Sequence, residues 1–417
     1  MMNKIPKGWE IKKLGDIAIT SSGGTPLRTH SEYWNGNIKW LKISDLNDSL
    51  IDNSDEFITE IGLKNSSAKI LKKGTLLVAM YGSIGKLGIL NTEATTNQAI
   101  CAIINKKDKK FEIKFLFYFF MSAKEKMLNE SFGGVQKNIS QTYLKNLEIP
   151  LPNLTEQKAI VDKLDDSFAK IENAITNLIN AKENLKLYKQ SALKSAFNGD
   201  LLPNTSPTHW EVKKLGEIIS KEKYSMKRGP FGSALKKEFF VDNGIRVFEQ
   251  YNPINSDPHW KRYFITKEKF KELEAFKASA GDLLISCSGT LGKILELPKN
   301  TEIGIINQAL LKIKLDQKQI LNSFFIHYFN SNKFQNLILE KTIGTAIKNI
   351  ASVSELKQLE IPLPPLSEQN LIVAEIDRRF AIVDKTLNLI DKSIQNAKNL
   401  KQSILKKAFS GELRSEI

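Results

Sequence analysis

The chain carries one eleven-residue phrase twice, changed only from Asn153 to Pro365 and from Thr155 to Ser367. LEIPLPNLTEQ begins at Leu147 and LEIPLPPLSEQ begins at Leu359, 212 residues later. A repeat of this kind has to be recognised before any other pattern is interpreted, because it means that the chain contains two copies of one structural unit. Each half of the 417 residues is long enough to bury a hydrophobic core of its own.

The match between the two halves extends well beyond this phrase. PKGWEIKKLGDI from Pro6 matches PTHWEVKKLGEI from Pro207, and SALKSAFNGDL matches SILKKAFSGEL at the ends of the copies. Shorter matches lie between them, GSIGK with GTLGK and NQA with NQA. The segments 18–72 and 219–279 differ most. We interpret the repeat as one scaffold that presents two different surfaces.

Each copy ends in a segment that predicts a long helix. Thr155 and Ser367 are suitable N-caps, and Gly199 and Gly411 suit the left-handed position after a helix. Apolar residues recur in both segments at alternating steps of four and three, which is a heptad seam. The predicted seam residues are Leu164, Phe168, Ile171, Ile175, Leu178, Ile376, Phe380, Val383, Leu387 and Ile390.

We expect the helices at 155–197 and 367–409 to form an antiparallel coiled coil that holds the two bodies at its opposite ends. An amphipathic helix lying on a globular core is the alternative for each. The bodies contain short apolar runs typical of buried strands, such as TLLVAM and DLLISC, and aromatic segments with helical spacing.

The predicted fold class is therefore α+β, with two globular mixed α/β bodies separated by two long helices. The predicted domains are bodies at 1–150 and 203–362, and helical segments at 151–202 and 363–417.

The net charge of +15 is concentrated in the two bodies. Residues 1–154 carry +6 and residues 203–366 carry +7, whereas 155–202 is neutral and 367–417 carries +2. A basic balance of this size indicates a polyanionic partner, most often nucleic acid. A lysine-rich solvated surface is the alternative explanation.

The motifs of several other protein classes are missing from the sequence. The pieces GSIGK and GTLGK lack the outer Gly and the following Ser or Thr of a nucleotide-binding P-loop, but a glycine turn followed by Lys can hold a DNA phosphate. A plain β-turn is the alternative. Cys101 and Cys287 have no disulfide or zinc spacing, and we expect no bound metal. No signal peptide or membrane span is predicted, so a cytoplasmic location is expected.

In each copy, a body that contains GSIGK or GTLGK and NQA is followed by the LEIPLP phrase and by a helix that begins near its EQ pair. This order, present twice, resembles the specificity subunit of type I restriction–modification enzymes. The resemblance covers essentially the whole chain. It implies that each body is a target recognition domain reading one half of a bipartite DNA target, and that the helices fix the spacer between the halves. It also implies partners: two adenine-N6 methyltransferase subunits, which use S-adenosylmethionine, and restriction subunits that use ATP and Mg²⁺.

By this resemblance the chain is a non-catalytic DNA-binding subunit of a phage-defence system and binds no cofactor itself. The DNA-binding candidates lie in matched turns and in the divergent segments of both bodies. They are Gly24, Thr25, Lys39, Tyr81, Ser83, Lys86, Asn97, Gln98, Lys137, Arg228, Phe231, Ser233, Lys236, Gln250, Ser288, Thr290, Lys293, Asn307, Gln308 and Lys348.

Some of these candidates have a structural alternative. The glycines suit turns without any ligand, and Asn97 and Asn307 could bond loop backbone rather than a base. For the whole chain, two alternatives stay open: a DNA-recognition subunit of another phage-defence methylation system, and a coiled-coil adaptor with two protein-binding domains.

Overall fold

The computed structural model describes residues 6–106, 111–133, 137–203, 207–340 and 350–413. They fall into two compact units: the first is Met1–Leu178 with Asp391–Ile417, and the second is Ile179–Ile390. Among these residues, no helix combines the length and the apolar character that crossing a lipid bilayer requires.

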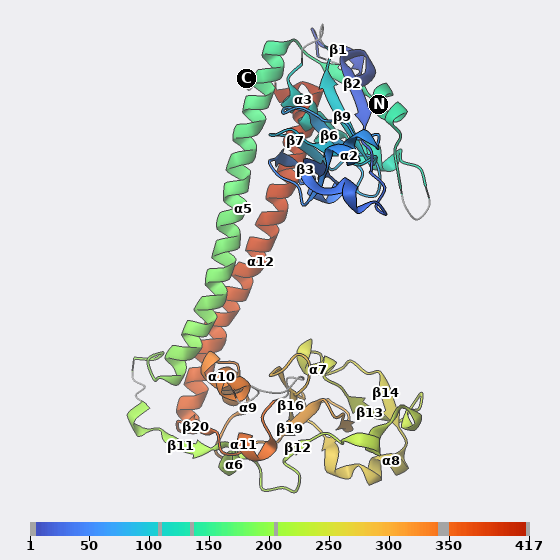
Figure 1. Ribbon diagram of the computed structural model, residues 1–417. Coiled ribbons are helices and arrows are strands. Elements are labelled where there is room, and N and C mark those ends of the chain that lie inside the picture. The colour runs from blue at the N-terminus through green and yellow to red at the C-terminus, as the bar shows by residue number, and fades with distance from the viewer. Residues whose placement is uncertain (1–5, 107–110, 134–136, 204–206, 341–349, 414–417) are drawn as a thin grey trace. The chain divides into compact units, whose positions relative to one another are not determined.

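Among the described residues, the first unit contains a five-stranded sheet, a three-stranded sheet, a two-stranded pair that is treated below, and four short or medium α-helices (Figure 1). The five-stranded sheet has the order β2 (Ala18–Ser22), β9 (Ile100–Asn105), β6 (Leu76–Ala79), β7 (Leu87–Leu90), β4 (Ser49–Ile51). The three-stranded sheet has the order β5 (Glu56–Ile58), β3 (Trp34–Leu41), β8 (Thr95–Thr96). The helices are α1 (Leu14–Ile17), α2 (Glu60–Lys64), α3 (Ile113–Asn129) and α4 (Gln141–Asn146).

The second unit repeats this plan with two four-stranded sheets. One has the order β12 (Met226–Arg228), β19 (Leu310–Ile313), β16 (Leu283–Ser286), β17 (Ile294–Glu296). The other has the order β14 (Tyr263–Ile265), β13 (Ile245–Phe248), β18 (Gly304–Ile306), β15 (Lys277–Ala278). The helices are α6 (Leu215–Ile218), α7 (Tyr251–Ile254), α8 (Lys267–Glu272), α9 (Asn322–Phe329), α10 (Asn332–Glu340) and α11 (Val353–Leu356). The prediction of mixed α/β bodies is confirmed.

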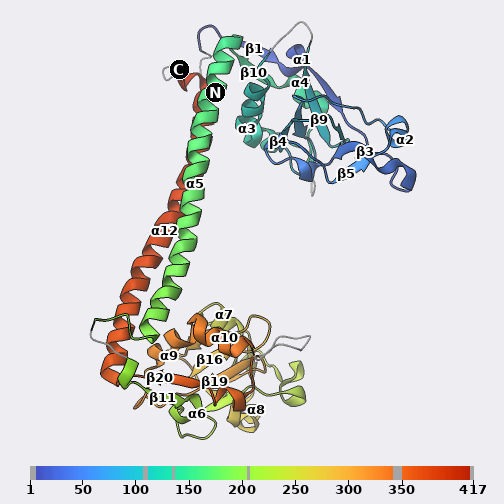
Figure 2. The same ribbon diagram turned by 60° about the vertical axis from the view of Figure 1, so that its left-hand side comes forward.

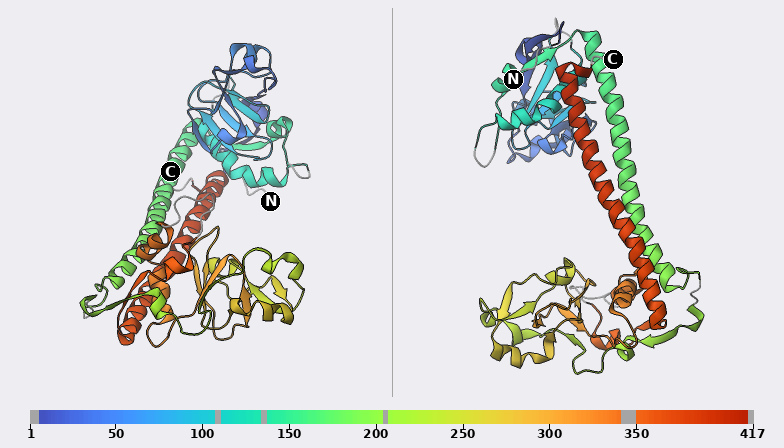
Figure 3. Two further views of the ribbon diagram at one scale, coloured as in Figure 1. Left: turned by 60° about the horizontal axis from the view of Figure 1, so that its bottom comes forward. Right: turned by 180° about the vertical axis from the view of Figure 1, so that it is seen from behind.

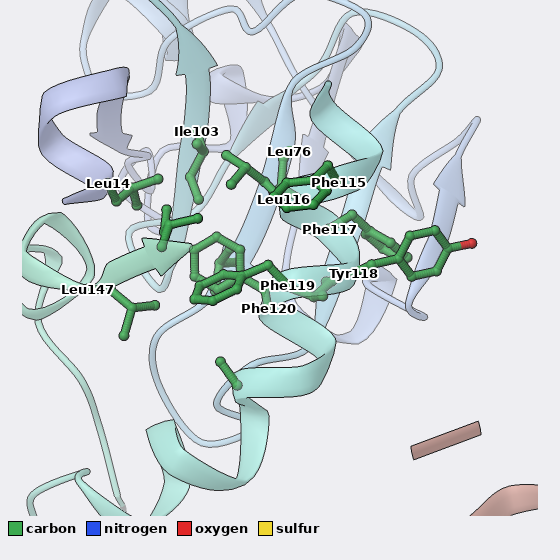
Figure 4. Packing of buried hydrophobic residues seen from close by; sticks show 14 of the residues in the cluster. Leu14, Leu76, Ile103, Phe115, Leu116, Phe117, Tyr118, Phe119, Phe120 and Leu147 are labelled. Atoms are coloured by element: carbon green, nitrogen blue, oxygen red, sulfur yellow. The ribbon is translucent and has the colours of Figure 1, made fainter. Parts of the chain in front are cut away.

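The core of the first unit is built around α3. Its successive residues Phe115–Phe120 are all buried and pack against strands of the five-stranded sheet and against Leu14 and Leu147 (Figure 4). On its other side the helix meets Phe409, whose ring centre lies 5.2 Å from that of Phe115. The aromatic cluster is thus a packing core.

The equivalent aromatic segment of the second unit is two helices, not one. Helix α9 ends at Phe329, and α10 begins at Asn332. The buried Ser331 between them causes the break, because its hydroxyl donates to Tyr328 O at 2.6 Å and accepts from Phe334 N–H at 3.3 Å. Phe324 and Tyr328 of α9 pack against Phe197 at ring distances of 5.4 and 5.0 Å.

Each copy ends in one uninterrupted helix, α5 (Leu154–Phe197) and α12 (Leu366–Ser410), so the prediction of long helices is confirmed. The predicted N-caps are wrong, since both helices begin one residue before Thr155 and Ser367. Asn153 caps α5 instead: its Oδ1 accepts from Glu156 N–H at 2.9 Å.

The residue before α12 is Pro365, whose carbonyl oxygen accepts the Gln369 N–H at 2.9 Å. At the other ends, Gly199 and Gly411 adopt the left-handed conformation, with φ of +80° and +79°.

The two long helices contact each other within each unit. In the first unit Lys401 pairs with Glu172, and in the second unit Lys189 pairs with Asp384 at 2.6 Å. Residue 189 lies 17 positions after 172, and residue 384 lies 17 positions before 401. The pairing is therefore antiparallel and keeps one register in both units, as a coiled coil requires.

The predicted seam residues are shielded from solvent, and the two pairing lysines lie over seam rings, Lys401 over Phe168 and Lys189 over Phe380. Six are buried, namely Leu164, Phe168, Ile171, Ile376, Val383 and Ile390. Four are half-buried, namely Ile175, Leu178, Phe380 and Leu387. Views from other sides show the start of α5 beside the end of α12 in the first unit (Figures 2 and 3).

The repeated phrase closes each body onto its long helix. Strand β1 (Glu10–Lys13) pairs with β10 (Glu148–Leu151), and β11 (Glu211–Lys214) pairs with β20 (Glu360–Leu363), in the same antiparallel register. The first-turn glutamate of each long helix accepts a bond from the tryptophan before the first strand. Trp9 Nε1 lies 2.9 Å from Glu156, and Trp210 Nε1 lies 2.9 Å from Glu368.

The glutamine of the phrase is buried in both copies. Gln157 Nε2 donates to Pro152 O at 2.8 Å, and its Oε1 accepts from Glu112 N–H at 2.9 Å, just before α3 begins. Gln369 makes the matching bonds to Pro364 O and Leu321 N–H, both at 2.9 Å. One side chain therefore joins the phrase, the long helix and the first turn of the body's core helix.

We predict that Gln157→Leu lowers the free energy of unfolding of the first unit by about 2–4 kcal/mol. A leucine of similar size would leave the buried Pro152 carbonyl and the half-buried Glu112 N–H without partners, at a cost of roughly 1–3 kcal/mol for the carbonyl and about 1 kcal/mol for the N–H. Urea unfolding of the full chain measures the change. Lys158→Ala, at an exposed neighbouring position, is the control. Equal stability of Gln157→Leu and the wild type would contradict this account.

Candidate nucleic-acid interface

The two Gly-Lys pieces form matching hairpin turns. The first joins β6 to β7, with Gly82 and Gly85 at φ of +64° and +72°. The second joins β16 to β17, with Gly289 and Gly292 at φ of +66° and +67°. A Cβ on Gly289 would meet nothing within 4 Å, so the tip of this turn faces open space. The tip of the second turn can therefore accept a close partner.

The side chains of these turns differ in exposure and in chemistry. Tyr81 and Ser83 are exposed and Lys86 is half-buried in the first turn. In the second, Thr290 and Lys293 are exposed and Ser288 is half-buried.

The NQA turns lie directly beside the hairpin turns. Met80 N–H donates to Ala99 O, and Cys287 N–H donates to Ala309 O, both at 2.8 Å. The asparagine of each turn has an internal role: Asn97 Oδ1 accepts from Ala99 N–H, and Asn307 Oδ1 accepts from Ala309 N–H, both at 3.1 Å. These hydrogen bonds give each asparagine side chain a structural role within its own turn.

The glutamines Gln98 and Gln308 are exposed at the tips of the same turns. They are therefore the NQA side chains that the scaffold presents to a partner.

A glycine loop from the beginning of each body packs on the NQA turn. A Cβ on Gly23 would lie 2.0 Å from Thr96 O, and one on Gly229 would lie 1.8 Å from Asn307 O. Only glycine permits this approach, and it brings Thr25 and Phe231 to the turn. Thr25 donates a hydrogen bond to Gln98 Oε1. Gly24 is buried and accepts a bond from Trp40 Nε1 at 2.8 Å, so packing accounts for it.

The end of one strand completes the arrangement in each unit, β3 in the first and β13 in the second. Asn97 N–H donates to Leu41 O at 2.9 Å, and Asn307 N–H donates to Phe248 O at 3.0 Å. The next residues along these strands are Lys42 with Ile43 in the first unit and Glu249 with Gln250 in the second. Glycine loop, strand end, hairpin turn and NQA turn therefore meet at one side of each unit, which we call the recognition edge.

The recognition edges carry different groups at matched positions. Lys42 Nζ donates to Glu56 at 2.9 Å in the first unit. In the second unit, Glu249 Oε2 and Gln250 Oε1 are buried acceptor atoms with no hydrogen-bond partner among the described residues. Burial raises the pKa of the Glu249 carboxyl, and the nearby Arg262 opposes this.

Lys42 and Glu249 were missing from the sequence prediction. Aligning NIKWLKIS with GIRVFEQY, which lie in the divergent segments, would have found both.

The other candidates lie around the recognition edges or are engaged elsewhere. Lys39 Nζ donates to Asp52 O at 3.0 Å and to Thr92 Oγ1 at 3.2 Å, which tethers a loop. Lys137 is exposed, and its carbonyl accepts from Gly82 N–H at 3.3 Å. Exposed positions in the second unit are Ser233 and Lys236, the latter 3.7 Å from Glu238.

Arg228 Nη2 lies 3.5 Å from Cys287 O, at the hairpin turn. Lys348 lies outside the described residues.

Two segments of the chain, residues 6–181 and 207–397, match the family model described as the type I restriction modification DNA specificity domain. The type I restriction enzyme MjaIX specificity subunit of Methanocaldococcus jannaschii is 27% identical over 441 residues, covering 100% of the chain and 96% of that relative. The EcoKI specificity subunit of Escherichia coli strain K12 is 24% identical over 434 residues, covering 99% and 91%.

Solved structures show the same fold. A chain from a study of complex assembly and conformational transition in the type I R-M system aligns with a TM-score of 0.75 at 21% identity, covering 97% of this chain and 98% of that one. The HsdS subunit from Thermoanaerobacter tengcongensis aligns with a TM-score of 0.59 at 20% identity, covering 98% of both chains.

We predict that Glu249→Gln stabilises the second unit at neutral pH. The pKa of the folded-state carboxyl lies above the ordinary value of 4.5, so the unfolded chain ionises first as the pH rises. The destabilising contribution is absent below pH 4.5, grows as the pH rises toward the folded-state pKa, and is constant above it. The glutamine variant lacks this contribution, and urea unfolding of both proteins across this pH range measures the difference.

Glu302→Gln is a control of opposite sign, because a bond from Lys261 lowers the pKa of that carboxyl. Its replacement should reduce stability at neutral pH. A difference between Glu249→Gln and the wild type that does not change with pH would contradict the prediction.

Proposed function

The chain belongs to the type I restriction–modification DNA specificity family, and we propose that each recognition edge reads one half of a bipartite duplex target. The observation that carries this proposal is the repeated geometry. Two units place the same four segments together, and they differ at the glycine-loop and strand-end positions, where Thr25 and Lys42 in the first unit stand against Phe231 and Glu249 in the second. Such an arrangement suits two unlike half-sites read by one scaffold.

In this proposal, residues 1–150 and 203–362 are the target recognition domains, and 151–202 and 363–417 are the helical spacers. Lysines such as Lys86 and Lys293 contact DNA phosphates and position each domain. Side chains at the tips, such as Gln98 and Gln308, contact base edges, which carry the sequence information. The basic charge of both bodies supports this assignment.

We further propose that the chain is a non-catalytic subunit. By its family resemblance it directs two adenine-N6 methyltransferase subunits, which carry S-adenosylmethionine, and restriction subunits, which carry ATP and Mg²⁺. The complex would act in the cytoplasm on incoming DNA.

The deciding experiment is an exchange of residues 1–150 for the matching body of a relative with a different target. Because each body closes on its own strand pair, only one half of the methylated sequence should change. Mapping N6-methyladenine in a genome that expresses the chain with its methyltransferase partner shows the outcome. Simultaneous change of both halves would count against independent recognition domains, and loss of salt-sensitive duplex binding would favour the protein adaptor alternative.

The paired helices generate a second prediction, on the spacer between the half-sites. One heptad is inserted into α5 between Glu172 and Lys189, and another into α12 between Asp384 and Lys401, which keeps the seam in register. Each insertion adds about 10 Å at 1.5 Å per residue. The preferred spacer should then grow by roughly three base pairs, at about 3.4 Å per pair.

The half-site sequences should stay the same, since no residue of a recognition edge has moved within its unit. Methylation mapping of this variant measures the spacer. Insertion into α5 alone is the control, because it breaks the pairing. An unchanged spacer with full activity would show that the helices do not set the distance.

A further inference from the structure

The two recognition edges differ sharply at the residue that follows each glycine loop. Thr25 occupies this position in the first unit and is joined by a hydrogen bond to Gln98. Phe231 occupies it in the second unit, and 64% of its surface is exposed. A single exposed apolar residue is common on proteins and by itself indicates nothing. The surroundings of Phe231 give it significance.

The chain on both sides of Phe231 is firmly anchored. Gly229 N–H donates to Leu310 O at 2.9 Å, and this glycine packs against Asn307 O. Pro230 is buried, and its ring fixes the backbone angle φ. After Phe231, the short 3₁₀ helix Gly232–Leu235 packs Ala234 and Leu235 onto the cluster of buried residues that contains Val247 and Ile265. The exposed ring is therefore held at the edge by structure rather than left on a loose loop.

Arg228 braces one face of the ring. Its guanidinium carbon lies over the Phe231 ring, 5.3 Å from the centre, within the range of a cation–π contact. Its Nη2 points to Cys287 O at the hairpin turn. With one face covered, the ring cannot stack between two bases as an intercalating wedge does, and its remaining face and rim are what it offers to DNA.

We propose that Phe231 contacts the 5-methyl group of a thymine in the second half-site, through the major groove. The inference rests on the proposed function, since it assigns a chemical group to one position of that recognition edge. Phenylalanine has no hydrogen-bonding group and so cannot read donors or acceptors. The thymine methyl is the apolar group that base pairs present in the major groove, and phenylalanine is among the side chains that contact it.

The test uses the full chain assembled with its methyltransferase subunits and a duplex that contains the mapped target. In the proposed function, the two methyltransferase subunits methylate one adenine in each half-site, so the second half-site contains an A·T pair and hence a thymine. Each thymine of that half-site is replaced in turn by deoxyuridine, which removes only the methyl group. Wild-type affinity should fall by about fourfold at one of these positions, the effect of one buried methyl.

Phe231→Ala should bind the thymine and deoxyuridine duplexes equally at that position, whereas Phe231→Leu should keep part of the discrimination. Val212→Ala is the matched control, because Val212 is 63% exposed in the same unit but lies on β11, in the strand pair formed with β20. This control should retain the wild-type preference. Deoxyuridine in the first half-site should affect wild type and Phe231→Ala alike.

Two results would overturn the inference: no deoxyuridine effect anywhere in the second half-site, or undiminished discrimination by Phe231→Ala. Both leave specific binding of the unmodified target intact, and so leave the proposed function standing. If instead the assembled complex binds all duplexes with equal affinity, the proposed function fails, and the inference fails with it.

Discussion

A buried glutamine at the start of each long helix ties a recognition body to that helix. Gln157 and Gln369 satisfy a carbonyl of the proline segment and the N–H group just before the body's core helix. A buried polar group left without a partner costs more free energy than a formed hydrogen bond contributes, so these contacts permit little adjustment of the junction. The strand pairs β1–β10 and β11–β20 add a fixed register to the same junction. Within each unit, the recognition edge therefore holds a defined position relative to the helix that follows it.

The sequence predicted the parts of the fold that depend on repetition and periodicity. The duplicated phrase revealed two units, and the four-three spacing gave the long helices and their antiparallel pairing. The prediction from sequence failed where neighbouring polar side chains compete for the same backbone hydrogen bonds. Thr155 has the chemistry of a cap, but Asn153 is placed two residues earlier and takes that role. Ser331 divides a continuous apolar pattern because its buried hydroxyl ends one helix and starts the next, which periodicity alone does not show.

The recognition edge was only partly visible in the sequence. The matched motifs pointed to the hairpin turns and the NQA turns, yet they did not show which of their side chains face inward. Asn97 and Asn307 bond their own turns, and Lys39 tethers a loop, and these contacts depend on tertiary structure. Glu249 lies in the segment where the two copies diverge, so the repeat gave no direct signal for it. Divergence between the copies indicates where their surfaces differ, but only the folded scaffold shows which divergent residues lie at the recognition edge.

Framework and reading groups are separated at each recognition edge. Glycines and asparagines hold the turns together through contacts with the backbone that are the same in both units, whereas the residue after each glycine loop differs in chemistry. In the first unit, the Thr25 hydroxyl donates to Gln98 Oε1, which ties the exposed Gln98 amide to the glycine loop. In the second unit, Phe231 has no bond of this kind and presents an apolar ring beside Arg228. In the proposed function, a substitution at a tip changes the chemistry offered to DNA while the backbone contacts of the turns remain, so one fold can present two unrelated half-site specificities in a single chain.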